Sequence, residues 1–559
     1  MTASGGPLLE IEHLTFRYRR ATEPAIRDLN LTVRAGQILL VAGPSGCGKS
    51  TLIRAINGLI PHAYPGELSG TVRLDGQLTT DLKLRDIALT VGTVLQDPAK
   101  QIVGATVDAE LAFGPENLGL PRSEIRARID RVAVQAGIEH LIGRETAALS
   151  GGERQLVATA GTLMMEPKLY VVDEPLANLD PATAARLLLL LRELADRGSA
   201  VVIVEHRVEE ALDLEPDSVL YLDAGRERYQ GPLDGFLRVA DPAAVKLPFE
   251  VVLERVRAGA HPDGTPPPDL ERPAAAGELP RLEFRGVHAG YGDTPVLRSV
   301  DASLARHEIV AVLGPNGSGK TTLFRTAMHL MQVVGGEVLV DGSSIANRSV
   351  ADLANVFGYV FQSPSQMLFA RTVREELLFG PRNLGRDPES FERIVSDALR
   401  RTSLADVDDI LDRPPLTLSF GQQKRLALAI ALALEPPTLI LDEPSAGQDH
   451  LTATAFMRQV LGIPGLESLY LVTHDVDLAL THADRILLFR DGQVVADGPP
   501  TAVIEDEARW IACNLRPTSL LRANARLGAP NGRFLSAEAL ARRIVSGERT
   551  TASRSEGRS

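Results

Sequence analysis

Two glycine-rich segments of this 559-residue chain have the residue types needed to hold a polyphosphate. GPSGCGKS begins at Gly43 and GPNGSGKT begins at Gly314, and each follows a short apolar run that is typical of a buried strand. Glycine amides at the start of a helix can wrap phosphate oxygens, and the lysine of the pattern can contact the β- and γ-phosphates. The residues expected to line the two phosphate sites are Gly43, Ser45, Gly46, Cys47, Gly48, Lys49, Ser50 and Thr51, and Gly314, Asn316, Gly317, Ser318, Gly319, Lys320, Thr321 and Thr322.

An acidic pair follows each glycine-rich segment at a closely similar distance along the chain. Asp173 and Glu174 end the apolar run LYVVDE, and Asp442 and Glu443 end TLILDE. In each pair the first carboxylate is placed to hold Mg²⁺ through water, and the second to orient or deprotonate an attacking water. The residues expected around the metal are Ser50, Gln96, Asp173, Thr321, Gln362 and Asp442.

Two further polar residues occur at matched positions. Gln96 and Gln362 can touch the metal or the attacking water and report the nucleotide state to a surface loop. His206 and His474 each end an apolar run, where a lone histidine is more often structural than catalytic. Their matched position favours a contact with the γ-phosphate, so we place both histidines with the catalytic residues.

All these motifs occur twice in the same order, which indicates a tandem duplication. The apolar runs before them predict parallel strands whose carboxyl ends open into a ligand crevice. The stretches GTVRLDG and GEVLVDG alternate as antiparallel strands do, and residues 121–138 have the apolar spacing of an amphipathic helix. Each copy is therefore expected to be an α/β domain with a parallel-sheet core, an antiparallel β subdomain and a helical subdomain.

The proline-rich stretch between the two copies of the motifs indicates the domain boundaries. We expect a first domain at residues 8–245, a helix and proline-rich linker at 246–280, a second domain at 281–505 and a C-terminal extension at 506–559. The extension contains nine arginines from Arg516 onward. We expect it to be solvated and partly disordered, above all in its last dozen residues, and a contact with anionic lipid headgroups is the alternative.

Charge and composition narrow the classes of function. The net charge of −13 argues against binding to nucleic acid. Two cysteines, Cys47 and Cys513, suit a reducing compartment and are too few for a disulfide framework or a four-ligand zinc site. No secretory signal is visible, and the apolar runs are shorter than the ~18 residues that a membrane helix needs. If the protein acts at a membrane, we expect another chain to supply the span.

This combination of motifs resembles the ATP-binding cassette (ABC) superfamily of P-loop ATPases, with LSGGE at residues 149–153 as the discriminating element. The resemblance implies ATP and Mg²⁺ as ligands, and Tyr18 and Tyr291 as the aromatic residues that stack on adenine. It also implies that two cassettes pair head to tail, so that the signature segment of each closes over the nucleotide of the other. Lys49 would then share a site with Ser419 and Gly421, and Lys320 with Ser150 and Gly152. The signature residues expected at the nucleotides are Ser150, Gly151, Gly152, Ser419, Phe420 and Gly421.

Two residues of these motifs carry specific expectations. Phe420 stands where the family has the first glycine of its signature, and if that backbone needs a positive φ, phenylalanine is unfavourable there. The site of Lys49 and Ser419 would then be slower or tuned differently. Cys47 lies inside the first glycine-rich segment, where amide dipoles should favour its thiolate, so that thiol reagents would inhibit and ATP would protect. The alternative is that Cys47 only fills a small position.

A finer resemblance is to the ATPase subunits of energy-coupling factor importers. It rests on DPAKQIVGATVDAELAFGPENLG after Gln96 and SPSQMLFARTVREELLFGPRNLG after Gln362. The resemblance implies a membrane coupling subunit and a substrate-binding membrane subunit as partners, a peripheral place at the cytoplasmic face of the membrane, and a vitamin, vitamin precursor or transition-metal ion as the solute. Gln101 and Gln366 would lie beside the surface that docks the coupling subunit. Three alternatives remain. The FGPxNLG segments argue against a tandem ATPase of a sugar importer, and the short linker argues against a protein acting on ribosomes. The scarcity of cysteines argues against a DNA-repair ATPase.

We predict that Glu174→Gln and Glu443→Gln each lower turnover at their own site by roughly 10²-fold or more, because the amide cannot accept a proton from water. Nucleotide binding should be retained. Measurement of ATPase rates and ATP affinity for each variant checks this, and wild-type activity in either variant would remove that glutamate from the catalytic role.

Overall fold

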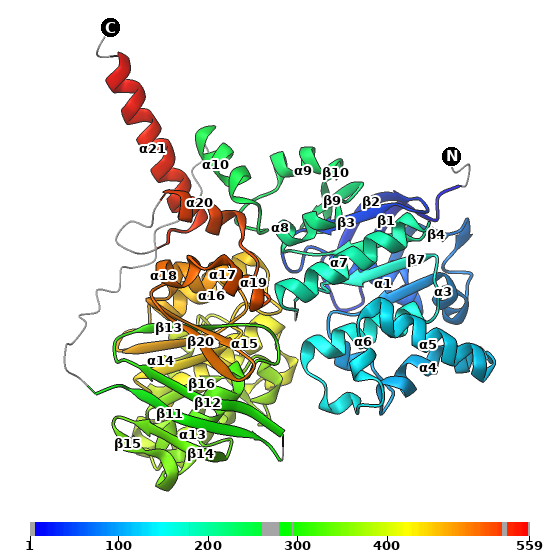
Figure 1. Ribbon diagram of the computed structural model, residues 1–559. Coiled ribbons are helices and arrows are strands. Elements are labelled where there is room, and N and C mark those ends of the chain that lie inside the picture. The colour runs from blue at the N-terminus through cyan, green and yellow to red at the C-terminus, as the bar shows by residue number, and fades with distance from the viewer. Residues whose placement is uncertain (1–5, 178, 260–278, 293, 528–533, 557–559) are drawn as a thin grey trace. The chain divides into compact units, whose positions relative to one another are not determined.

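The computed structural model shows two compact units, the first at residues 1–251 and the second formed by most of residues 252–559 (Figure 1). The residues that it describes are 6–177, 179–259, 279–292, 294–527 and 534–556. The proline-rich part of the expected linker therefore lies almost entirely outside the described residues. Among the residues described, no helix combines the length and the apolar character that crossing a bilayer requires.

The first unit is built on a six-stranded sheet in the order β10-β9-β3-β8-β7-β6. All residues of β3, β7 and β8 are buried, as their uninterrupted apolar runs predict for parallel strands covered on both faces. β3 lies between β8 and β9 and is parallel to both, whereas β10 is an antiparallel edge strand. The strands are β3 (Ile38–Ala42), β6 (Val91–Val94), β7 (Leu169–Asp173), β8 (Ala200–Val204), β9 (Ser218–Asp223) and β10 (Arg226–Gly231).

Two cores cover the faces of this sheet. Leu39, Val41 and Val202 pack with α1 and with a second, antiparallel sheet of order β2-β1-β4-β5. Leu40 and Ile203 face the opposite core, to which α6 and α7 contribute. The antiparallel strands are β1 (Leu9–Tyr18), β2 (Ile26–Val33), β4 (Gly66–Leu74) and β5 (Gln77–Leu78).

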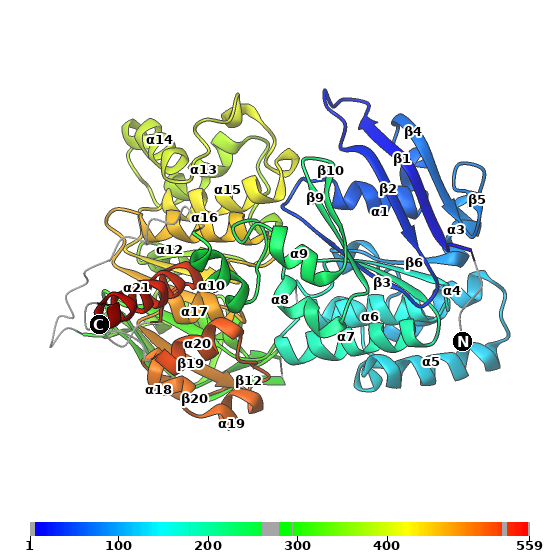
Figure 2. The same ribbon diagram turned by 90° about the horizontal axis from the view of Figure 1, so that it is seen from above.

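The helices of the first unit include a separate group, α4, α5 and α6, which lies apart from the antiparallel strands in both views (Figures 1 and 2). α5 begins after Pro121 and ends at Gly137, whose left-handed conformation closes the helix. The helices are α1 (Lys49–Ile56), α2 (Leu59–His62), α3 (Leu84–Thr90), α4 (Val107–Asn117), α5 (Arg122–Ala136), α6 (Gly151–Leu163), α7 (Pro181–Asp196), α8 (Val208–Ala211), α9 (Leu233–Val239) and α10 (Phe249–Arg257).

The second unit repeats this architecture. Its sheet order, β16-β17-β18-β13-β19-β20, is that of the first unit read from the other edge, and β12-β11-β14-β15 is its antiparallel sheet. The strands are β11 (Leu282–Tyr291), β12 (Thr294–Leu304), β13 (Ile309–Leu313), β14 (Val333–Val340), β15 (Ser343–Ser344), β16 (Phe357–Val360), β17 (Thr438–Asp442), β18 (Ser468–Val472), β19 (Arg485–Arg490) and β20 (Gln493–Gly498). The helices are α11 (Lys320–Ala327), α12 (Val350–Ala354), α13 (Val373–Asn383), α14 (Phe391–Arg401), α15 (Phe420–Leu432), α16 (His450–Leu461), α17 (Val476–His482) and α18 (Pro500–Ile504).

The C-terminal extension continues the core of the second unit. It contains α19 (Glu507–Ala512), α20 (Ser519–Leu527) and α21 (Ala537–Glu556), drawn in red in Figure 1. Trp510 and Phe534 are buried in the same apolar cluster as residues of β13 and β18. α21 runs from Ala537 to Glu556 and residues 557–559 lie outside the described residues, so the partial disorder of the extension stays a prediction.

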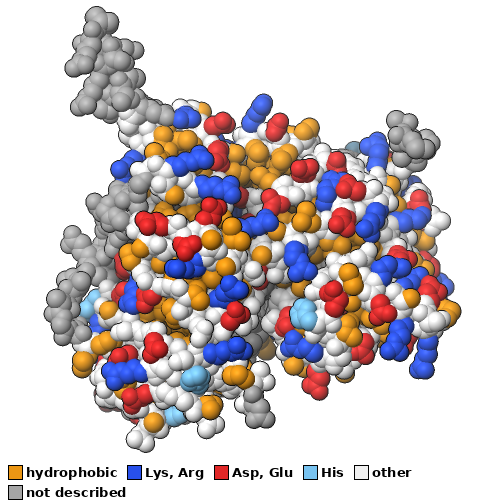
Figure 3. All heavy atoms as spheres, in the orientation of Figure 1, with side chains coloured by type: hydrophobic (Ala, Val, Ile, Leu, Met, Phe, Trp, Pro, Cys, Tyr) orange, Lys and Arg blue, Asp and Glu red, His pale blue; other side chains and the backbone are white. Residues whose placement is uncertain are grey.

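Charges of both signs are interspersed over the face shown in Figure 3. Ion pairs occur elsewhere in the described residues too, for example Arg131 with Glu166 at 2.5 Å and Lys168 with Asp75 at 2.6 Å. The net negative charge of the chain is therefore not concentrated on this face.

We predict that Trp510→Ala destabilises the second unit by about 3–5 kcal/mol, because it empties a buried aromatic site. Trp510 is 1% exposed and its indole N–H donates to the Val503 carbonyl at 2.9 Å. Chemical denaturation followed by circular dichroism measures the change. Ile511→Ala is the matched control, since Ile511 is 62% exposed and its loss should change stability by less than about 0.5 kcal/mol. Equal effects of the two substitutions would contradict a structural role for the extension.

Candidate nucleotide-binding and catalytic sites

The glycine-rich segments form tight loops between a buried strand and a helix. In the first unit the loop joins β3 to α1, and in the second it joins β13 to α11. A side chain is excluded at Gly43, where a Cβ would lie 2.3 Å from the Leu222 carbonyl oxygen, and at Gly48, where it would lie 2.5 Å from the Ala25 carbonyl oxygen. Both glycines also have positive φ, at 149° and 108°. These loops therefore have the backbone geometry that the phosphate-binding pattern requires.

Each loop holds the ammonium group of its own lysine. Lys49 Nζ donates to the carbonyls of Gly43 at 2.6 Å and Pro44 at 2.9 Å, and Lys320 Nζ donates to the matching Gly314 and Pro315 carbonyls, both at 2.8 Å. Both lysines are 6% exposed. The ammonium groups are thus fixed beside the loop amides, where a phosphate would be bound.

The acidic pairs lie at the carboxyl ends of β7 and β17. Asp173 is buried, and burial together with the charge of Glu174 raises the pKa of Asp173 to about 7. Burial and Glu443 likewise raise the pKa of Asp442 to about 6. A bound cation would offset this cost, so both sites favour a metal beside the first carboxylate.

The second carboxylate of each pair faces a histidine. His206 Nδ1 lies 3.8 Å from Glu174 Oε2, and His474 Nδ1 lies 2.9 Å from Glu443 Oε2. Burial raises the pKa of both glutamates, but the neighbouring histidine and lysine outweigh it and the net shift is downward. Both glutamates are therefore held ionised, as acceptors of a proton or of a water hydrogen bond must be.

The matched residues differ in their contacts with these carboxylates. Gln96 Nε2 donates to Glu174 Oε2 at 2.7 Å, so the structure places Gln96 directly on the acidic pair of the first unit. In the second unit Asp442 accepts hydrogen bonds from the Thr321 hydroxyl at 3.1 Å and from Tyr359, on β16, at 3.0 Å. Gln362 is exposed. The position of Tyr359 corresponds to Thr93 in the first unit, and its contact could not be read from the sequence because no motif contains it.

The oxygen atoms gathered here fit Mg²⁺. Carboxylates and hydroxyls are the hard donors that Mg²⁺ takes, and it usually completes its shell with water and substrate phosphates. The candidate donors are the Asp173 and Asp442 carboxylates with the hydroxyls of Ser50 and Thr321. Among the described residues, no group of three or more His, Cys, Asp or Glu side chains could hold a metal ion.

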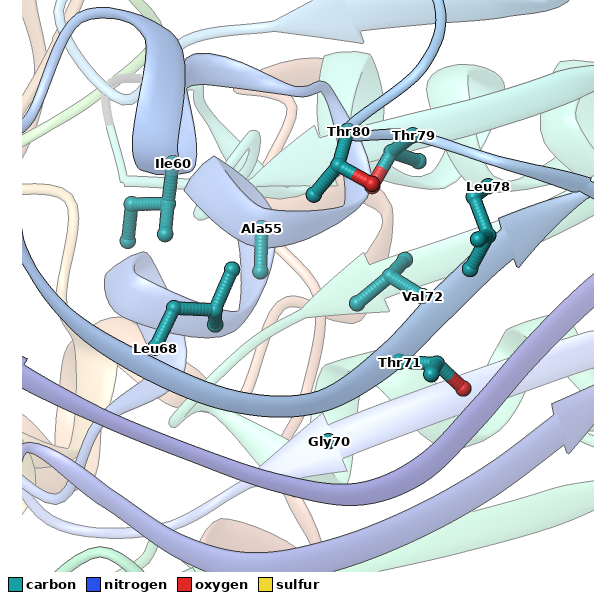
Figure 4. Close-up of a pocket in the computed structure, with 9 residues that line it drawn as sticks. All are labelled: Ala55, Ile60, Leu68, Gly70, Thr71, Val72, Leu78, Thr79 and Thr80. Carbon is teal, nitrogen blue, oxygen red and sulfur yellow. The ribbon is translucent and has the colours of Figure 1, made fainter.

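The aromatic residues expected at adenine lie at the ends of β1 and β11. The Tyr18 hydroxyl lies 3.1 Å from Thr51 Oγ1 and accepts from Arg54 Nη1 at 2.7 Å. Tyr18 lines a cavity of about 340 Å³ together with Arg17, Arg19, Pro65, Gly66 and Glu67. Tyr291 is 54% exposed, and its hydroxyl accepts from Arg325 at 3.3 Å. A smaller cavity of about 100 Å³, between α1 and β4, is lined mainly by apolar and threonine side chains and contains none of the expected site residues (Figure 4).

The signature segments cap two equivalent helices. Ser150 accepts from the Glu153 amide at 3.3 Å while the Glu153 carboxylate accepts from the Ser150 amide at 2.7 Å, which is a capping box at the start of α6. Ser419 and Gln422 form the same box at the start of α15. The N-termini of both helices present backbone amides, a favourable setting for an anion.

Comparison with known proteins agrees with this geometry. The family model described as ABC transporter matches residues 26–177 and 297–446. The chain belongs to the ABC transporter family. It is 34% identical over 549 residues to a putative ABC transporter ATP-binding protein of Methanosarcina acetivorans, with 91% of this chain and 89% of the relative covered. A relative of the same description in Streptococcus mutans is 31% identical over 540 residues, with 93% and 96% covered.

A solved structure was also matched, that of CbiO1 from Clostridium perfringens, described as part of the ABC transporter complex CbiONQ. It is 31% identical in sequence, with a TM-score of 0.38, and the match covers 45% of this chain and 99% of that one. The duplicated family match and the relatives of nearly full length show that the present chain is a tandem ATP-binding ABC protein and an ATPase.

The ABC signature of the second unit is not strained by Phe420. Phe420 and its counterpart Gly151 are each the first residue of a helix, and neither has a positive φ. Any non-proline residue adopts that conformation, so the strain considered from the sequence does not arise. The Phe420 side chain is 44% exposed and does not distort the loop.

The structure also shows the surroundings of Cys47 and Gln101. Cys47 is 2% exposed, and its burial raises the pKa of the thiol despite the nearby Lys49. The favoured thiolate was therefore a wrong expectation, because desolvation outweighs the loop dipoles. Gln101 also turns inward: its side chain accepts from the Leu95 amide at 2.8 Å and donates to the Thr93 carbonyl at 3.1 Å, so it holds the Gln96 loop. Gln366 is exposed.

We predict that Cys47 reacts with a maleimide at least about 10²-fold more slowly in the folded chain than in denaturant, since a buried protonated thiol is a poor nucleophile. Mass spectrometry of the labelled peptide follows the reaction, with Cys513, also buried, as an internal comparison. Rapid labelling of Cys47 in the folded chain that ATP blocks would restore the original expectation.

Proposed function

We propose that this chain is the complete ATPase pair of an energy-coupling factor importer, docked at the cytoplasmic face of a membrane. The observation that carries the proposal is a matched pair of exposed apolar side chains in each unit, on the segment that follows Gln96 or Gln362. Val103 and Phe113 are 63% and 52% exposed in the first unit, and Phe369 and Phe379 are 65% and 51% exposed at the same positions in the second. Isolated exposed apolar side chains are common, but a pair repeated in both units favours a binding role.

The two pairs lie on the segments with the importer-like sequence. Phe113 is in α4 and Phe379 is in α13, and each belongs to an FGPxNLG segment. The Phe369 and Phe379 rings are 4.8 Å apart in an edge-to-face arrangement, so they form one apolar projection. This surface suits the short cytoplasmic helices of a hydrophobic membrane subunit, which would pack against the rings.

A direct route joins this surface to the site of hydrolysis in the first unit. Gln96 contacts Glu174, and Gln101 holds the same loop through Leu95 and Thr93. The loop continues to Val103, whose amide donates to Glu110 of α4 at 2.8 Å. Movement of a docked helix would therefore displace Gln96, and a change at Glu174 would displace the docking surface.

For the reaction itself we propose that two ATP molecules are held at the seam between the two units. Lys49 would share its nucleotide with Ser419 and Gly421, and Lys320 would share its nucleotide with Ser150 and Gly152. Mg²⁺ supplies charge stabilisation at the β- and γ-phosphates when bound. The lysines neutralise phosphate charge, the first carboxylates hold the metal through water, and the second carboxylates accept a proton from the attacking water. The capping serines and the histidines orient the γ-phosphate.

Closure of the two units around ATP would move the docked helices, and hydrolysis would release them. The solute path and its selectivity then belong to the membrane partners. We propose a vitamin, a vitamin precursor or a transition-metal ion as the solute class, on the strength of the duplicated importer-like segments.

The proposal predicts that Phe113→Glu combined with Phe379→Glu lowers recovery of the membrane partners at least about tenfold, because a charge at the centre of an apolar contact must be desolvated. The tagged full chain is purified from solubilised native membranes, and the accompanying proteins and retained solute are identified by mass spectrometry. Leu189→Glu is the control, since Leu189 is 59% exposed on α7, away from the importer-like segments.

The expected wild-type result is a polytopic coupling subunit together with a small membrane protein that retains a vitamin or metal ion. Recovery of ribosomal proteins, or of a sugar-importer permease, would contradict the proposal. Equal loss in the Leu189→Glu control would remove the docking role of the two phenylalanines.

A further inference from the structure

The loop that follows the catalytic glutamate is anchored differently in the two units. In the second unit this loop is tied to the signature helix α15. Lys424 Nζ donates to the carbonyls of Glu443 at 3.2 Å, Pro444 at 2.6 Å and Ala446 at 2.8 Å. Lys424 is 1% exposed, and these three contacts use all three of its donor hydrogens. The helix that Ser419 caps, α15, is therefore hydrogen-bonded to the backbone at Glu443 and just after it.

The part of the first unit that the structure describes has no equivalent of these Lys424 hydrogen bonds. Gln155 occupies the position of Lys424, five residues after the capping serine, and its buried amide makes no hydrogen bond to the part of the chain that the structure describes. The loop is held instead at Leu176, whose amide donates to Glu205 at 2.9 Å and whose carbonyl accepts from Arg207 at 2.8 Å. Glu205 and Arg207 flank His206, so in this unit the loop is anchored to the end of β8.

The residues that flank the histidine also differ between the units. The second unit has Thr473 and Asp475 on either side of His474, and the Thr473 hydroxyl accepts from the Asp475 amide at 3.0 Å. Neither residue can reproduce the Glu205 carboxylate and the Arg207 guanidinium. Among the described residues, the loop is therefore held by side chains of the strand end, Glu205 and Arg207, in the first unit and by Lys424 of the signature helix in the second.

Phe420 strengthens the contact between α15 and the loop. A Cβ placed on Gly447 would lie 3.0 Å from the Phe420 ring, so this glycine permits the ring to rest on the loop. The Lys424 ammonium lies 5.9 Å from the centre of the same ring, within the range of a cation–π contact. Two residues one helical turn apart, Phe420 and Lys424, therefore contact the same loop.

Breaking this contact is costly. Drawing α15 away from the loop would leave the buried Lys424 amine without its carbonyl acceptors, and burial already lowers the pKa of Lys424 to about 7. A buried polar group that loses its hydrogen-bond partners is unfavourable in either protonation state. The N-terminal turn of α15 and the backbone at Glu443 should consequently move together.

We propose that Lys424 and Phe420 make hydrolysis by Glu443 depend on engagement of Ser419. This inference rests on the head-to-tail pairing proposed above, in which Ser419 contacts the nucleotide of Lys49, whereas Glu443 acts on the nucleotide of Lys320. Binding at the first site is then transmitted through α15 to the second site. In the part of the first unit that the structure describes, which leaves out position 178 of this loop, Gln155 makes no matching link from the helix of Ser150 to the loop after Glu174. We therefore expect the communication to run in one direction. Lys424 acts as a positioning residue.

The test isolates each site in the full-length chain. In a Glu174→Gln background only Glu443 supports turnover, and in a Glu443→Gln background only Glu174 does. Lys424→Gln, which introduces the residue found in the first unit, is added to both, and ATPase rates are measured against ATP concentration. In the Glu174→Gln background, we expect Lys424→Gln to lower kcat about tenfold and to change KM less than about twofold. The Hill coefficient should fall to about 1. In the Glu443→Gln background, Lys424→Gln should change the rate less than about twofold.

Two additional variants make the outcome decisive. In the Glu174→Gln background, Phe420→Gly should lower kcat by a smaller factor than Lys424→Gln does, about threefold. Lys424→Met repeats the test with a second side chain of similar length, and thermal unfolding confirms that each variant is folded. An equal loss in both backgrounds, or an unchanged kcat and Hill coefficient in the Glu174→Gln background, would overturn the inference.

Ser150→Arg separates this inference from the pairing on which it rests. With Glu174→Gln, an arginine at Ser150 should abolish hydrolysis if Ser150 closes the site of Lys320. If it does so while Lys424→Gln has no effect, the pairing holds and the link through Lys424 fails. If Ser150→Arg leaves hydrolysis unchanged, the pairing and the link fail together.

Discussion

The central constraint in each unit is that the carboxyl ends of adjacent parallel strands meet at one edge of the sheet. β3 ends in the loop of Lys49, β7 ends in Asp173 and Glu174, and β8 ends shortly before His206. Because β3 pairs with β8 and β8 pairs with β7, these groups are brought together by backbone hydrogen bonds rather than by side-chain contacts. The same pairing in the second unit, through β13, β18 and β17, builds an equivalent set of groups.

A shared topology does not make the two sites identical. Gln96 donates to Glu174 in the first unit, whereas in the second Tyr359 and Thr321 donate to Asp442. The loops after Glu174 and Glu443 are held by different elements, although the strands that position them correspond. Duplication thus preserved the groups that we expect to contact ATP, while the residues that support them diverged.

Much of the architecture follows from local sequence. Uninterrupted apolar runs ending in polar residues predict β3, β7, β8 and their repeats, and the glycine-rich segments predict the phosphate loops between strand and helix. The duplication shows that both sites carry the same residue types. These features depend on residues close together in the chain, where pattern and chemistry agree.

Other features depend on contacts between distant residues, and the sequence could not predict them. The φ of Phe420 is not visible in the sequence, so strain there could not be judged. The burial of Cys47 in an apolar cluster, which keeps its thiol protonated, is not visible either. Lys424 lies in an ordinary helix pattern, yet it reaches three carbonyls about twenty residues away.

The central claim is that both nucleotides are held between the units, each by the lysine of one and the signature serine of the other. The most direct measurement is a structure of the full chain carrying Glu174→Gln and Glu443→Gln, determined with Mg²⁺ and ATP. The account predicts one γ-phosphate within hydrogen-bonding distance of Lys49 and Ser419, and the other within that distance of Lys320 and Ser150. Two bound nucleotides with Ser150 and Ser419 both facing solvent would contradict it.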